Sequence, residues 1–130
     1  MSTANLRPDR NPYLAGEVAA DVSLQNLAEL LRSGGLWAQV RESSHYVGGR
    51  YLRVTEDGDF ILEEVAAGNF LARAVADTDQ QLLEVAARAS ATLAGNDIRH
   101  RFELYNGQST LVHDLHHRWP QVQPPTKEIT

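Results

Sequence analysis

The stretch DTDQQLLEVAARASATLAGNDIRHRFELYNGQSTLVHDLHH (Asp77–His117) decides the fold, because it joins a helix pattern to a hairpin pattern. Thr78 followed by Gln81 fits a capping box, which marks the start of a helix. Gly95 can adopt the left-handed conformation that ends one. The alanines of this helix would let it lie close to a sheet. Its predicted buried face consists of apolar residues at helical spacing: Leu82, Ala86, Ala89 and Leu93.

The second half of this stretch predicts a β-hairpin that turns at Asn106-Gly107, a dipeptide typical of two-residue hairpin turns. Because loop length fixes the pairing of the two strands, such a turn sets the register. One face of the hairpin then carries apolar residues and is expected to face the core. The predicted register places these residues opposite one another: Phe102 and Leu111, His100 and His113, Arg99 and Asp114, Asp97 and His116.

Working towards the N-terminus, RYLRVTEDGDFILEEVA (Arg50–Ala66) predicts another hairpin. A two-residue turn at Asp57-Gly58 would oppose Val54 with Ile61. A three-residue turn, with Gly58 left-handed and a bulge, instead opposes Val54 with Phe60 and Leu52 with Leu62. We prefer the second register because it gathers four apolar side chains on one face. A further strand is predicted over residues 69–76.

Near the N-terminus, SLQNLAELLRSGG (Ser23–Gly35) predicts a helix with Ser23 as its N-cap. Weak strand patterns flank it at residues 16–22 and 36–42. The order β-α-β-β-β-β-α-β-β predicts an α+β fold, in which a mainly antiparallel sheet of five to six strands carries both helices on one face. We expect residues 1–14 to form a flexible arm, residues 15–120 a single domain and residues 121–130 a flexible tail.

Composition narrows the classes of function. The formal charge of −5 disfavours a nucleic-acid binder, which needs a basic face to displace counterions. The chain contains no cysteine, which excludes disulfides, thiolate zinc sites and a cysteine nucleophile. The first residues lack the apolar run of a secretory signal, and no later window is long enough to span a membrane.

The histidines near the C-terminus raise the question of a metal or catalytic site. A metal needs three or four donors that converge on one point, and His100, His113 and His117 could share a side of the hairpin. The alternative is structural: two neutral imidazoles share a hydrogen bond at the sheet rim, which predicts sensitivity to acid. We favour the structural interpretation and predict no catalytic, cofactor-binding or metal-binding residue.

An acidic run suggests a docking surface instead. No Lys or Arg lies between Val54 and Ala72, and the run can either keep a hairpin tip solvated or attract a basic partner. Trp119, just past the last predicted strand, could anchor the same interface or close the end of the core. The predicted partner-binding residues are Glu56, Asp57, Asp59, Glu63, Glu64 and Trp119.

The segment IRHRFELYNGQSTLVHDLHHRWP (Ile98–Pro120), preceded by an alanine-rich helix pattern, resembles the C-terminal part of small acidic immunity proteins. These are encoded beside bacterial polymorphic toxins of contact-dependent and type VI secretion systems. The resemblance implies a cytoplasmic, non-enzymatic α+β protein that binds and blocks a cognate toxin domain, often a nuclease or a nucleic-acid deaminase. It implies no particular site residues, no cofactor and no choice between monomer and homodimer.

Two other functions compete with this expectation. A secretion chaperone is also small, acidic and α+β, although such chaperones usually dimerise through a helix. A small metal-dependent enzyme would use the clustered histidines, and elemental analysis of the purified protein tests it.

Overall fold

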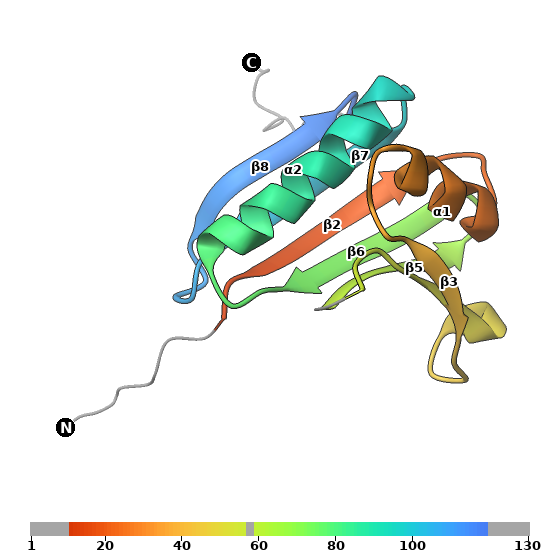
Figure 1. The fold of residues 1–130 in the computed structure, drawn as a ribbon, viewed down its shortest axis with the longest axis horizontal. Helices are drawn as coiled ribbons and strands as arrows, with labels where there is room; N and C mark the ends of the chain where they lie inside the picture. The colour runs from red at the N-terminus through yellow and green to blue at the C-terminus, as the bar shows by residue number, and fades with distance from the viewer. Residues whose placement is uncertain (1–10, 57–58, 120–130) are drawn as a thin grey trace, which may run out of the picture.

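The computed structural model describes residues 11–56 and 59–119. Its strands form one antiparallel sheet in the order β3-β4-β5-β6-β2-β7-β8. Figure 1 shows α2 lying along β2, β7 and β8, while α1 lies towards β3 on the same side of the sheet. The elements are β2 (Tyr13–Ala19), α1 (Leu24–Ser33), β3 (Gln39–Glu42), η1 (Val47–Gly49), β4 (Arg50–Arg53), β5 (Asp59–Ala66), β6 (Asn69–Val75), α2 (Asp79–Gly95), β7 (Arg99–Tyr105) and β8 (Leu111–His117).

The α+β class and the predicted order of elements are confirmed, but the sheet has seven strands where five to six were expected. The predicted order already listed seven strands, and all of them join the sheet, including the four-residue β3 at the edge, which pairs with β4. The predicted N-terminal arm, residues 1–14, also extended too far along the chain. Tyr13 and Leu14 already pair with β6 and β7, and Leu14 is buried. Residues 1–10 of the predicted arm and the tail at 121–130 lie outside the described residues.

Both predicted helix starts are confirmed by their caps. The Ser23 hydroxyl accepts a hydrogen bond from the Asn26 amide at 3.0 Å, and the Thr78 hydroxyl accepts one from the Gln81 amide at 3.1 Å. Each bond satisfies an amide that has no partner within the helix. The apolar face predicted for α2 is buried as expected, and it packs on the sheet together with the buried face of α1.

The register of the β4–β5 hairpin is also as predicted. Leu52 pairs with Leu62, and the Val54 amide donates to the Phe60 carbonyl at 2.8 Å. These four side chains are buried, so the register follows the face that reaches the core.

The register of the β7–β8 hairpin was predicted wrongly. His100 lies opposite His117, Phe102 opposite Leu115 and Glu103 opposite Asp114. The loop is longer than two residues: the Asn106 amide donates to the Thr110 carbonyl, and Ser109 takes a left-handed φ of 63°. The Asn106 carboxamide accepts from the Gln108 and Thr110 amides, so it opens the turn and does not occupy its centre.

Candidate protein-binding surfaces

Four long strands of the sheet, β2, β5, β6 and β7, each have a buried side and a solvent side. The residues on the buried side contact α1 and α2, while the alternate residues form what we call the open face of the sheet. The three phenylalanines all lie on the buried side. All four tyrosines are at most half-buried and belong to the open face or to the loop beside it: Tyr13, Tyr46, Tyr51 and Tyr105.

Polar contacts hold these tyrosines in place. Tyr13 and Tyr105 stack with ring centroids 4.9 Å apart. The Tyr105 hydroxyl donates to Glu103 Oε1 at 3.0 Å, which raises the pKa of the tyrosine. The Arg73 guanidinium donates to the Tyr46 hydroxyl at 3.1 Å and lies over its ring. An ordered layer of tyrosine and arginine on a solvent-exposed sheet is typical of a protein interface.

The middle of the open face is hollowed around the short side chain of Ala15. The hollow has a volume of about 450 Å³, and Arg73, Glu63 and Trp119 line it. Trp119 is half-buried there, with the Arg99 guanidinium 5.3 Å from its ring centroid. Trp119, which was predicted to lie at a rim, therefore lies on the open face and lines the same hollow as Glu63.

The predicted acidic docking residues do not share one surface. Glu63 lines the hollow of the open face, whereas its neighbour Glu64 points to the other side of β5, because adjacent strand residues alternate. Glu56 and Asp59 line a different hollow, and Asp57 lies outside the described residues. The prediction of a single face that includes both Glu63 and Glu64 is wrong for this reason.

A second hollow, which we call the acidic hollow, lies where β5 begins, β6 ends and α2 starts. Its volume is about 610 Å³. Trp37 contributes a half-buried aromatic side chain, and Arg88 is the one cationic residue among the described lining residues. The carboxylates that line it come from three parts of the chain: Glu56, Asp59, Asp77 and Glu84. Such a hollow can attract a basic side chain, and an aromatic ring at its wall can stack on a guanidinium.

Asp77, Glu84 and Trp37 are missing from the predicted partner-binding residues. Glu84 lies on the polar side of the α2 pattern, which the apolar spacing does reveal. Nothing in the sequence shows that this side of α2 faces the start of β5. Trp37 on its own fits a core position as well as a binding site.

The histidines form a polar seam between α2, β7 and β8. His100 is fully buried; its Nδ1 lies 2.9 Å from the Ile98 carbonyl and its Nε2 2.7 Å from the Ser90 hydroxyl. Because a carbonyl can only accept, Nδ1 carries the proton and Nε2 accepts from Ser90. Burial lowers the pKa of His100, and the bond to Ile98 opposes this effect only in part. The lowered pKa favours the neutral form of His100 at pH 7.

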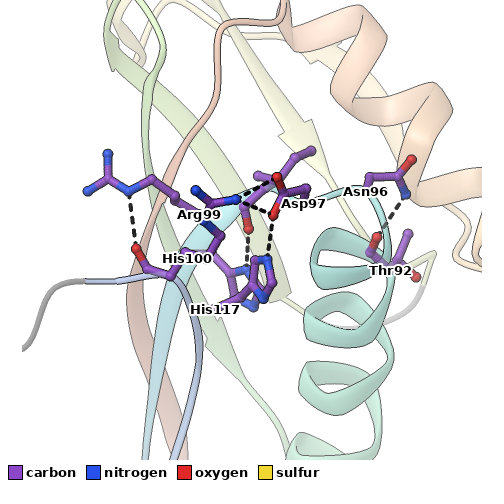
Figure 2. Close-up of polar contacts among 8 residues, drawn as sticks. Thr92, Asn96, Asp97, Arg99, His100 and His117 are labelled. Carbon is purple, nitrogen blue, oxygen red and sulfur yellow. Dashed lines mark hydrogen bonds and ion pairs between the residues drawn. The ribbon is translucent and has the colours of Figure 1, made fainter.

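Asp97 ties the end of β8 to the start of β7, as Figure 2 shows. His117 Nε2 lies 2.9 Å from Asp97 Oδ1, and the Arg118 guanidinium donates to Asp97 Oδ2 at 2.7 Å. These bonds lower the pKa of Asp97, and the bond from His117 has the larger effect.

The predicted pairing of His100 with His113 is wrong, because His113 is exposed and opposite Leu104.

Ser90 and His100 are at the distance of a nucleophile and its base, but neither lines one of the two hollows. Within residues 11–56 and 59–119, no three His, Asp or Glu side chains are grouped so that they could hold a metal ion.

Neither described helix has the length and apolar composition that crossing a bilayer requires. Comparison with protein-family models, curated proteins and solved structures finds no match for this chain.

Proposed function

We propose that this protein is a non-enzymatic immunity protein that binds a secreted bacterial toxin domain through the acidic hollow. The observation that carries the proposal is that four carboxylates and Trp37 line one hollow, with Arg88 as the cation among its described lining residues. The resemblance of residues 98–120 to immunity proteins of polymorphic toxin systems supports the same function.

Charge complementarity favours one class of toxin. A toxin that acts on nucleic acid presents a basic cleft to the phosphates, and a cluster of carboxylates can occupy that cleft in their place. We therefore propose a nuclease or a nucleic-acid deaminase as the target. The immunity protein would work in the cytoplasm, where such a toxin meets its substrate.

The carboxylates also suit a binding role because they come from different elements. Asp59 begins β5, Asp77 follows β6 and Glu84 lies on α2. The fold thus holds their backbones in place before a partner arrives, which reduces the entropy lost on binding. A long basic side chain can reach several of these groups while its stem packs against Trp37.

The test uses the toxin domain encoded beside this gene. The purified pair should bind, and co-expression should restore growth to cells that express the toxin. In the double variant Asp59→Lys, Asp77→Lys we expect the Kd to rise by at least about 100-fold, because like charges then face each other in the hollow. Added salt should weaken the wild-type complex.

Glu64→Lys is the control for charge reversal, since it replaces one carboxylate on β5 outside both hollows with lysine, as each half of the double variant does inside the acidic hollow. Its Kd should change by less than about fivefold, as for most positions outside the energetic centre of an interface. If the wild type neither binds nor protects, the function is wrong. If the double variant Asp59→Lys, Asp77→Lys binds as well as the wild type, the acidic hollow is not the docking surface.

A further inference from the structure

We infer that the open face of the sheet is the interface at which two copies of this chain form a symmetric dimer. This face carries the tyrosines, together with Leu71 and Val75, which are 46% and 41% exposed. Aromatic residues and arginine are enriched in the central part of protein interfaces. The interface adjoins the acidic hollow at Val75, which also lines that hollow, and it does not depend on a toxin.

The charges on the open face follow the printed register of the strands. In one row across the sheet, Arg73 on β6 is two strands from Glu103 on β7, and Ala15 on β2 lies between them. In the next row the signs run the other way. There Glu63 on β5 is three strands from Arg101 on β7, and Leu71 and Glu17 lie between them.

This alternation makes the face complementary to itself. A two-fold axis parallel to the strands, between β6 and β2, places β6 of one copy over β2 of the other and β5 over β7. Glu63 then lies over Arg101 of the second copy. Arg73 lies over Ala15 of the second copy, one strand spacing of about 4.8 Å from Glu103, which an arginine side chain spans. Symmetry forms each contact twice.

The size of the face suits a dimer. The five long strands, β5, β6, β2, β7 and β8, span about 24 Å across and about 23 Å along the sheet at ordinary strand spacings. This projected area is about 550 Å². Side-chain relief and β4, which lies over β8 of the second copy, increase it towards the roughly 800 Å² per partner of a standard interface. Sheets stacked face to face interdigitate their side chains in this way.

The experiment measures the mass of the purified full chain by analytical ultracentrifugation over a concentration series. The wild type should sediment as a dimer. Arg73→Glu and Glu103→Arg should each raise the dimer Kd by at least about 100-fold, because each places two like-charged pairs across the interface. An equimolar mixture of the two single variants should recover the dimer, since the mixed pair restores opposite charges at both contacts.

Recovery on mixing cannot come from an effect inside one chain, so it separates the interface from a purely structural role. Glu29→Arg on the exposed surface of α1 is the control and should leave the dimer unchanged. Leu71→Arg gives a second way to break the interface at an exposed residue if a charge variant fails to fold. A monomeric wild type, an unaffected dimer in the folded variants, or a mixture that stays monomeric would overturn the inference.

Discussion

The two sides of the sheet use the same strands for different purposes. Phe102 on β7 is fully buried beside Phe60, whereas Tyr105 on the same strand stacks with Tyr13 at the surface. Phenylalanine has no polar atom to satisfy, while a tyrosine hydroxyl needs a partner such as the Glu103 carboxylate. The difference teaches that the side covered by helices supplies the stability, while the open face is ordered but available for binding.

The largest effect expected from this comparison is on the buried side. Phe102→Ala should lower the free energy of unfolding by about 3–5 kcal/mol, because it removes a buried ring and leaves a cavity next to Phe60 and His100. Urea denaturation followed by circular dichroism measures the change. A loss below about 1 kcal/mol would show that the core collapses around the cavity, or that the ring contributes little.

A smaller effect on the same side comes from pH. The pKa of His100 in the folded protein lies below its ordinary value of 6.5, so unfolding takes up a proton as the pH falls through this range. Stability should be complete above about pH 6.5 and should decline as the pH falls towards the lowered folded-state pKa. Denaturation curves from pH 7.5 to pH 5 measure this decline.

His100→Gln serves as the control for the pH effect. Glutamine does not titrate, so the decline with falling pH should be largely absent, although the variant is less stable overall. Asp97 does not contribute to the decline in stability, because its lowered pKa keeps it ionised between pH 7.5 and pH 5. A wild type whose stability at pH 5 equals that at pH 7.5 would contradict the account of a buried neutral imidazole.

The two hairpins show how far the sequence can predict the fold. Both contain a strong turn signal, but only the β4–β5 register was predicted correctly. In that hairpin Leu52, Phe60 and Leu62 all need burial, and one register alone satisfies them. The pattern of apolar residues, and not the turn dipeptide, decided the prediction.

The β7–β8 hairpin lacks this second constraint. β8 is an edge strand, and Leu111 and Val112 are 45% and 42% exposed, so burial does not distinguish one register from another. The prediction then rested on Asn106-Gly107 alone. The Asn106 carboxamide instead stabilises a longer loop through the Gln108 and Thr110 amides, a choice that local dipeptide preference does not reveal.

The candidate site shows the same limit. The acidic run predicted a single docking surface, but strand alternation separates Glu63 from Glu64. The fold then brings Asp77 and Glu84 to Glu56 and Asp59 across gaps in the sequence. Which acidic groups meet depends on how α2 crosses the sheet, and this follows from packing and not from local pattern.

The smallest effect on folding is expected at Tyr13, on the open face. Tyr13→Ala removes one ring of the stacked pair with Tyr105 and should lower the free energy of unfolding by only about 0.5–1.5 kcal/mol, well below the loss for Phe102→Ala. Tyr13→Phe keeps the ring and should change the stability little. Because Val75 of a second copy would lie over Tyr13, the alanine variant should nevertheless weaken the dimer measured by ultracentrifugation. A large loss of stability without weaker association would mean that the open face serves folding, as the covered side does.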